Sequence, residues 1–254
     1  MLWQEILKDS VVNRRELHRI PEICWQEKKT FDYLVKILDK DSISWTPCSS
    51  TGLVAQLAQG APGAHIALRA DMDGLLISET NDLEYRSTED NHMHACGHDG
   101  HMAVMLATAR WLKHHEEKLS GPVTLIFQPA EEGGYGAKEM IANGALNGVD
   151  KIFGWHNWPA ISYGKAICKE GVVMCANASF TIELAGSGGH ASQPDSCYEP
   201  VLAAAAVTMA LRQSVRRRLP PLVAAVVSGT ASDAKGGETS IPERAVLWGS
   251  GRMA

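Results

Sequence analysis

The feature that most constrains the fold is a series of short apolar segments in which apolar and polar residues do not alternate. Turn residues bound each segment, as expected for strands buried on both faces. Amphipathic helical patterns separate them, and strands that take turns with helices are typical of an α/β fold. We therefore expect a mostly parallel sheet with helices on both faces. The predicted strands cover residues 52–57, 65–69, 123–127 and 151–155, and the predicted helices cover 28–38, 102–115 and 137–145.

The pattern changes after about residue 170. The next strand alternates between apolar and polar side chains, which is typical of a sheet with one open face. A long helix rich in Ala and Val follows, and then two more strands. These predicted elements are a strand over 176–184, a helix over 200–217, and strands over 221–228 and 245–249.

The two patterns predict two domains, residues 1–172 with the mostly parallel sheet and residues 173–254 with a smaller α+β fold. One helix against three strands leaves part of an apolar sheet face uncovered. We therefore expect the second domain to be incomplete within this sequence.

Charge and hydropathy exclude several classes of partner. Lys and Arg number 24 and Asp and Glu number 29, so the net charge of −5 gives no general attraction to nucleic acid or to an anionic membrane. No apolar stretch is long enough to cross a bilayer. Glu5 and Lys8 interrupt the N-terminal segment, which is unlike a signal peptide. We expect a cytoplasmic protein whose six scattered cysteines are free thiols.

The densest group of reactive side chains lies directly before a predicted helix, in Met93-His-Ala-Cys96-Gly-His98-Asp99-Gly-His101. Cys96 and His98 are two residues apart, so their side chains would leave the same face of an extended segment and suit one metal. Asp99 is placed to cap the free N–H groups of the helix. A capped helix with exposed histidines is the alternative, but it leaves the cysteine unexplained.

Three other predicted strand ends carry metal-type side chains. The adjacent Glu131 and Glu132 point in different directions, so one can bind metal while the other moves a proton. Asp71 and Asp73 could hold a ligand imidazole in its orientation, and His156 follows the last strand. Singly, the glutamates would be a solvated turn and the histidine a core residue. Jointly, sulfur, nitrogen and oxygen ligands favour Zn²⁺, with Mn²⁺, Co²⁺ or Ni²⁺ as alternatives, and argue against Mg²⁺ and Ca²⁺.

These motifs resemble the amidohydrolase branch, subfamily D, of the M20 metallopeptidase family. The branch holds hippurate hydrolases, N-acyl-amino-acid amidohydrolases and auxin-conjugate hydrolases. The resemblance follows the family's order along essentially the whole chain, and it rests on residues 15–22, 69–73, 94–101, 129–134 and 154–159. It implies a hydrolase that cuts the amide bond of N-acyl amino acids or similar small conjugates, with two divalent metal ions per subunit.

The resemblance also implies a role for individual residues. Cys96 would bridge the two ions, and His98, Glu132 and His156 would each ligate one or the other. Glu131 would be the general base, which takes a proton from the attacking water and delivers it to the leaving amine.

Residues 173–254 are similar to the family's lid domain, through which members form homodimers. His190 resembles the histidine that reaches the active site of the partner subunit, where it would stabilise the oxyanion. Family members continue past the lid with a further histidine ligand, so the resemblance implies a chain truncated at its C-terminus. Where the family commonly has Asn before Ile241 and Pro242, this chain has Glu238-Thr-Ser.

Three other functions are compatible with the sequence. The first is a catalytically inactive, truncated member of the same family. The second is an amidase that uses Cys96 as its nucleophile with a nearby histidine. The third is a dimerising binding module without catalysis.

Overall fold

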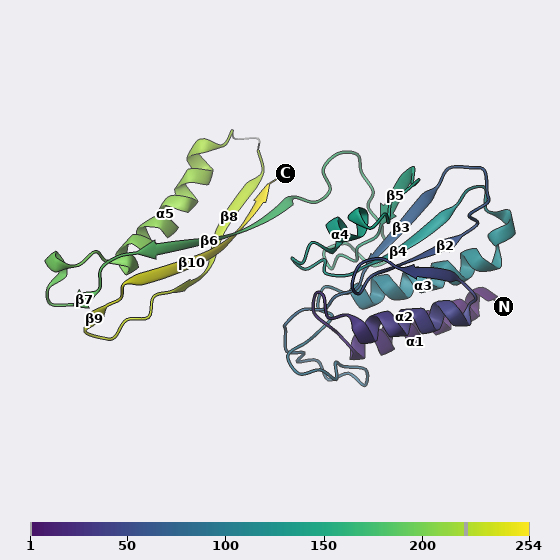
Figure 1. The fold of residues 1–254 in the computed structure, drawn as a ribbon, viewed down its shortest axis with the longest axis horizontal. Coiled ribbons are helices and arrows are strands. Elements are labelled where there is room, and N and C mark those ends of the chain that lie inside the picture. The colour runs from purple at the N-terminus through teal and green to yellow at the C-terminus, as the bar shows by residue number, and fades with distance from the viewer. Residues whose placement is uncertain (1, 221–222, 254) are drawn as a thin grey trace. The chain divides into compact units, whose positions relative to one another are not determined.

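The computed structural model describes residues 2–220 and 223–253, which form two compact units, Met1–Ser162 and Tyr163–Ala254 (Figure 1). The domain boundary that the sequence predicts, between residues 172 and 173, stays a prediction. None of the helices that the structure describes combines the length and the apolar character needed to cross a membrane.

A five-stranded mixed sheet forms the centre of the first unit, in the order β1-β2-β4-β3-β5. β3 pairs in parallel with β4 and β5, whereas β2 pairs antiparallel with β1 and β4. Four strands therefore share one direction and β2 alone opposes them, because the short connection from β1 allows only a hairpin. The α/β class is confirmed, but β1 was not predicted. The strands are β1 (Ser44–Pro47), β2 (Leu53–Leu57), β3 (Ile66–Asp71), β4 (Val123–Gln128) and β5 (Lys151–Gly154).

Helices cover both faces of this sheet, as predicted (Figure 1). Successive side chains of a strand point to opposite faces, and β4 shows the consequence. Leu125 and Phe127 pack in the larger core with the helices α1, α2 and α3, while Ile126 packs against Met140 of α4 on the other face. The helices are α1 (Leu2–Arg19), α2 (Lys28–Lys40), α3 (His98–His114) and α4 (Gly136–Ala142), with a 3₁₀ turn at Glu116–Lys118.

β5 departs from the prediction of a strand buried on both faces. Ile152 is 49% exposed and Phe153 is 54% exposed. Among the described strands β5 pairs only with β3, so it forms an edge of the sheet. Apolar composition does not distinguish an edge strand from a central one, which is why the prediction is wrong here.

The second unit is a smaller α+β fold with a three-stranded antiparallel sheet in the order β6-β10-β8. Ile182 and Leu184 of β6 pack with Ala204 of α5 and Leu247 of β10, while Glu183 between them is exposed, which explains the alternation in the sequence. The predicted strand over 221–228 begins outside the described residues. The elements are β6 (Ala176–Ala185), α5 (Pro200–Arg218), β8 (Ala225–Asp233), β10 (Arg244–Met253), the short pair β7 (Gly189–His190) and β9 (Ser240–Ile241), and a 3₁₀ turn at Pro194–Ser196.

Candidate metal centre

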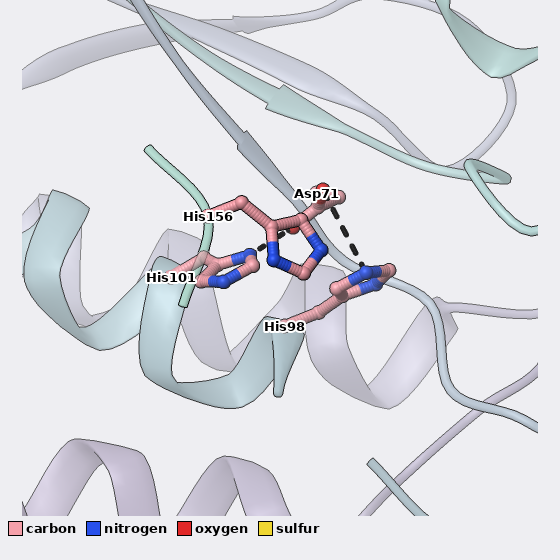
Figure 2. Close-up of side chains that lie close together, drawn as sticks. All are labelled: Asp71, His98, His101 and His156. Carbon is pink, nitrogen blue, oxygen red and sulfur yellow. Dashed lines mark hydrogen bonds and ion pairs between the residues drawn. The ribbon is translucent and has the colours of Figure 1, made fainter. Parts of the chain in front are cut away.

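The polar side chains that follow the strands meet at one edge of the mixed sheet. Because β3 and β4 are parallel and Asp71 lies opposite Gln128, the segments after both strands leave at the same edge. β5 is also parallel to β3 and leads to His156. His98, at the start of α3, lies beside Asp71 and His156 (Figure 2). Ligand sites of α/β sheets form at this carboxyl edge.

All four predicted metal ligands come together there. Ligand atoms of Cys96, His98 and Glu132 lie within 4.8 Å of one another. His156 joins this group, because its Nε2 lies 3.5 Å from Cys96 Sγ. The predicted base is adjacent, with Glu131 Oε2 4.0 Å from His98 Nε2. Thiol, imidazole and carboxylate groups therefore face one small volume.

His98 is held with one ring nitrogen aimed at this volume. Its side chain is buried, and Nδ1 donates a hydrogen bond to the main-chain oxygen of Asp73 at 2.8 Å. In the neutral imidazole, Nε2 then carries the lone pair. Nε2 is buried and finds no hydrogen-bond partner among the residues that the structure describes. A buried, unpartnered nitrogen that faces a thiol and carboxylates fits a metal ion as its missing partner.

The electrostatics of the cluster favour a positive charge at the same place. Burial disfavours the charged form of His98, but the contact with Asp73 and the nearby Cys96 thiol and Asp71 carboxylate outweigh it and raise its pKa to about 11. The surrounding groups thus stabilise a cation. A divalent metal ion would supply that charge without protonating the imidazole.

Asp71 and His101 form a second layer beside the ligands. Their side chains lie close to those of His98 and His156 (Figure 2). His101 Nδ1 donates to Asp71 Oδ1 at 2.5 Å, and His101 Nε2 accepts from the main-chain N–H of Asn157 at 3.1 Å. Both ring nitrogens of His101 are therefore engaged. The sequence reasoning gave no role to His101 or Asn157, although His101 lies one helical turn after His98 and so on the same helix face.

Gly97 explains how Cys96 and His98 face the same volume. Its φ of +88° is in the left-handed region that favours glycine, and a Cβ there would lie 2.7 Å from the side-chain amide of Asn157. His98 already belongs to α3. The two ligands therefore flank a sharp turn into a helix, and the predicted extended segment is wrong.

Glu131 and Glu132 lie in a tight turn whose main-chain N–H groups are hydrogen-bonded by Asp73. Oδ1 of Asp73 accepts from the main-chain N–H of Glu131 at 3.0 Å, and Oδ2 accepts from that of Glu132 at 2.9 Å. Burial and the charge of Glu132 raise the pKa of Glu131 above its ordinary value. A carboxylate with a raised pKa accepts a proton more readily, as a general base must.

Two predicted roles lie outside this cluster. Asp99 does not cap α3, and the prediction is wrong: the N-cap is Gly97, and the Asp99 carboxylate accepts instead from Arg14 Nε and His18 Nδ1, each at 2.8 Å. Asp99 is the second residue of the helix, so its side chain points to α1 rather than over the helix end. His190 lies in β7 of the second unit, exposed, and its catalytic role stays a prediction.

Comparison with known proteins identifies the family of the chain. Residues 67–254 match the sequence model of Peptidase family M20/M25/M40. An N-acetyl-L-cysteine deacetylase from Bacillus subtilis (strain 168) is 39% identical over 242 residues, which cover 94% of this chain and 58% of that protein. An N-acyl-L-amino acid amidohydrolase from Geobacillus stearothermophilus is 36% identical over 250 residues, or 94% of this chain and 67% of that protein. The chain thus spans about three fifths of the length of such relatives.

The structures agree with the sequences. The crystal structure of a dinuclear metal-binding peptidase of the M20 family from Bacillus subtilis matches with a TM-score of 0.77 at 34% sequence identity. The match covers 98% of this chain and 65% of that one. The chain therefore belongs to peptidase family M20/M25/M40 and, within it, to the amidohydrolase branch.

Proposed function

We propose that the protein is a metal-dependent amidohydrolase that cleaves the amide bond of N-acyl amino acids or similar small conjugates. The observation that carries the proposal is the convergence of a thiol, a second imidazole and two carboxylates on His98 Nε2, a buried nitrogen without a hydrogen-bond partner among the described residues. The substrate class is supported by the relatives, one of which is named as a deacetylase of N-acetyl-L-cysteine and another as an amidohydrolase of N-acyl-L-amino acids.

Cys96, His98, Glu132 and His156 would hold two divalent ions per subunit, as the related dinuclear peptidase does. Their mixture of sulfur, nitrogen and oxygen suits Zn²⁺ or Mn²⁺, with Co²⁺ and Ni²⁺ as alternatives. When bound, such ions make a water molecule more acidic and draw electron density from the amide carbonyl.

Glu131 would move the proton. Its carboxylate lies 4.0 Å from the ligand nitrogen of His98, close to the reacting atoms, and its side chain is 40% exposed and so accessible to water. It would take a proton from the attacking water and deliver it to the amine nitrogen as the amide bond breaks. The hydrogen bond from the main-chain N–H of Glu131 to Asp73 holds the backbone of Glu131 beside the proposed ligands.

The second unit would act as a lid and as the surface through which the protein forms a homodimer. His190 of each subunit would then stabilise the oxyanion in the active site of the other. The hydrogen bonding of His190 supports a donor role. Its Nδ1 accepts from the main-chain N–H of Ser192 at 3.2 Å, so the proton resides on Nε2.

The proposal is tested by assaying the purified protein on N-acetyl-L-cysteine, N-benzoylglycine and related amides, with added Zn²⁺ or Mn²⁺ and after EDTA treatment. We expect hydrolysis that EDTA abolishes and metal restores. Glu131→Gln should keep its metal and lose turnover by about 10²-fold or more, the usual scale for a general base, whereas Glu132→Gln should lose metal first.

Three outcomes would contradict the proposal. Full activity in both glutamate variants would discard the mechanism. Hydrolysis that resists EDTA but is abolished by iodoacetamide would favour a cysteine nucleophile. A protein that dimerises but neither retains metal nor hydrolyses any of these amides would be a binding module.

A further inference from the structure

The connection between α1 and α2 holds the Glu131–Glu132 turn (residues 129–134) at both of its ends. Glu27 Oε1 accepts a hydrogen bond from the main-chain N–H of Ala130 at 2.8 Å. At the other end, the indole Nε1 of Trp25 donates to the main-chain oxygen of Gly134 at 3.0 Å. A segment far away in sequence thus holds the loop that carries the proposed base and a proposed ligand.

Burying Glu27 at this position lowers the stability of the fold. It is fully buried, and its second carboxylate oxygen accepts from the Thr51 hydroxyl at 2.6 Å. Both donors are neutral groups, so neither compensates the charge of the carboxylate. Burial raises the pKa of Glu27, although these hydrogen bonds act in the opposite direction. Burying a carboxylate without a cationic partner costs stability, which suggests that Glu27 is placed here for what its oxygens hold.

The residue that Glu27 holds is a strained one. Ala130 has a φ of +51°, in the left-handed region that a side chain disfavours. This conformation turns the chain as it leaves β4. The next two amides, of Glu131 and Glu132, then point at Asp73. Three consecutive main-chain N–H groups are therefore held by two buried carboxylates, those of Glu27 and Asp73.

The packing beside the turn leaves no space for a side chain at Gly134 or at Gly136. A Cβ added to Gly136 would lie 1.8 Å from the main-chain oxygen of Pro129, and one added to Gly134 would lie 2.6 Å from Ala130 Cβ. The direction in which Glu131 and Glu132 leave the turn therefore rests on this packing and on the hydrogen bonds accepted by Glu27 and Asp73.

We propose that Glu27 is a positioning residue of the metal centre: through Ala130 it sets the direction in which Glu131 and Glu132 leave the turn. Where it concerns turnover, this inference rests on the proposed function. Gln at position 27 would still accept from Ala130 and could donate to the Thr51 hydroxyl, so Glu27→Gln should keep the geometry. Leu has a similar volume and no acceptor, so Glu27→Leu should release Ala130.

The chain offers a control of the same kind at the opposite ends of the strands, away from the metal centre. Glu116 Oε1 accepts from the main-chain N–H of Ala58 at 2.8 Å, and Ala58 also has a φ of +51°. Ala58 directly follows Leu57, which pairs with Val123 at the start of β4, away from the metal centre. Glu116→Leu therefore removes the same kind of main-chain contact away from the metal centre, together with the ion pair between Glu116 and Lys113 at 2.6 Å, and should affect stability alone.

The test compares Glu27→Leu, Glu27→Gln and Glu116→Leu. Three properties are measured for each variant: hydrogen exchange of the amides of residues 130–132 in metal-free protein, metal affinity by chelator competition, and the kinetic constants kcat and KM. We expect Glu27→Leu to speed exchange by about tenfold or more, since one hydrogen bond is lost. It should weaken metal binding by about 10–100-fold, the usual effect of removing a group that supports ligands. For Glu27→Gln and Glu116→Leu, the exchange rates and the metal affinity should stay within about threefold of those of the unmodified protein.

The inference is overturned if Glu27→Leu only lowers stability, as Glu116→Leu does, with exchange at 130–132 and metal affinity unchanged. Exchange and metal binding are measured without turnover, so an unmodified protein that hydrolyses nothing would count against the proposed function alone. If Glu27→Leu fails to fold, Thr51→Val serves instead, because it removes one donor to Glu27. It should shift exchange and metal affinity in the same direction by about threefold, and no shift would overturn the inference.

Discussion

Two buried polar clusters meet α3 at consecutive residues, and they are organised differently. His98 belongs to the metal centre described above, where its Nε2 finds no hydrogen-bond partner in the part of the chain that the structure describes. Asp99 belongs to what we call the closed cluster, formed by Arg14, His18, Glu79 and Asp99. In the closed cluster His18 contacts Asp99 at 2.8 Å through Nδ1 and Glu79 at 3.2 Å through Nε2.

The difference separates a structural cluster from a site. In the closed cluster both nitrogens of His18 are used within the protein, and Arg14 adds a second cation for two carboxylates. In the metal centre, the ligand atoms of Cys96, His98, Glu132 and His156 face one another, and His98 Nε2 has no hydrogen-bond partner among the described residues. Asp99 Oδ1 is also buried without a hydrogen-bond partner among the described residues, but Asp99 does not belong to either group of potential metal ligands found among them, so only the metal centre has the composition of a metal site. Changes in the two clusters should therefore have different consequences.

The largest effect should follow removal of the thiol from the metal centre. Cys96→Ala should lower the metal content by at least one ion per chain, because Cys96 Sγ lies among the ligand atoms of His98, Glu132 and His156. Elemental analysis of the purified protein after metal loading measures this. Cys48, buried with its thiol 3.6 Å from the main-chain oxygen of Met140, is the control. An equal loss from Cys48→Ala would contradict the assignment.

The comparison also shows what the sequence could predict. Non-alternating apolar strands and amphipathic helices were sufficient for the α/β class and for helices on both faces of the sheet. The exposure of β5 and the existence of β1 were not predictable, since both depend on which strands are neighbours. Trp45 and its three neighbours in β1 carry no strong strand pattern, and their pairing with β2 comes from the hairpin.

At the site, spacing identified residue types but not their partners. Glu132 and His156 were predicted as ligands because they follow strand ends, and Cys96 and His98 because a thiol and imidazoles cluster before a helix; the structure brings all four together. His98 and Asp99 are adjacent in one motif, but neighbours on a helix diverge by about 100°. One therefore faces the metal centre and the other faces α1. Contacts such as that of Glu27 with Ala130 join positions 103 residues apart, which no local pattern reveals.

Removing the histidine of the closed cluster should reduce stability and spare the metal centre. His18→Gln should lower the free energy of unfolding by about 3 kcal/mol, because it leaves buried carboxylates without their shared cation. Its metal content should equal that of the unmodified protein. A loss of metal like that of Cys96→Ala would mean that the two clusters are not independent.

The effect of His18→Gln should depend on pH. Hydrogen bonding to Asp99, opposed by burial, raises the pKa of His18 above its ordinary 6.5, with Glu79 adding to the shift and Arg14 opposing it. Its contribution is therefore present below pH 6.5 and is lost as pH rises through the raised pKa. The pKa values of Asp99 and Glu79 are lowered, despite their burial, so their contribution is lost as pH falls below their ordinary 3.8 and 4.5.

His94, whose ring lies 6.4 Å from that of His18, should not alter this window, because burial lowers its pKa to about 4. The difference in unfolding free energy between the unmodified protein and His18→Gln should thus be largest at about pH 5.5 and shrink towards about pH 9. Urea unfolding across this range measures it. A difference that grows with pH would contradict the charged state assigned to His18.

The smallest effect should come from the outer member of the closed cluster. The side chain of Arg14 is 37% exposed, and its Nε lies 2.8 Å from Asp99 Oδ2. Water can replace much of this contact and His18 still holds Asp99, so Arg14→Gln should cost only about 1 kcal/mol of unfolding free energy. Arg14 also lies over the ring of Tyr85 at 5.2 Å, and Arg15 lies over the same ring at 4.9 Å.

Arg15→Gln is consequently the matched control, since it removes a cation over Tyr85 without removing a contact to Asp99. Arg15→Gln should lower the free energy of unfolding by about 0.5 kcal/mol. Urea unfolding at about 0.05 and 0.5 M salt distinguishes the two variants. Screening at the higher salt concentration weakens the ion pair of Arg14 with Asp99, so the difference in unfolding free energy between Arg14→Gln and the unmodified protein should become smaller. If Arg14→Gln were as destabilising as His18→Gln, the charge of Asp99 would depend on the exposed arginine, and the cluster would not be closed from within. If both arginine variants keep their metal content and lose only a little unfolding free energy, the two clusters are independent. The boundary between them would then be the peptide bond that joins His98 to Asp99.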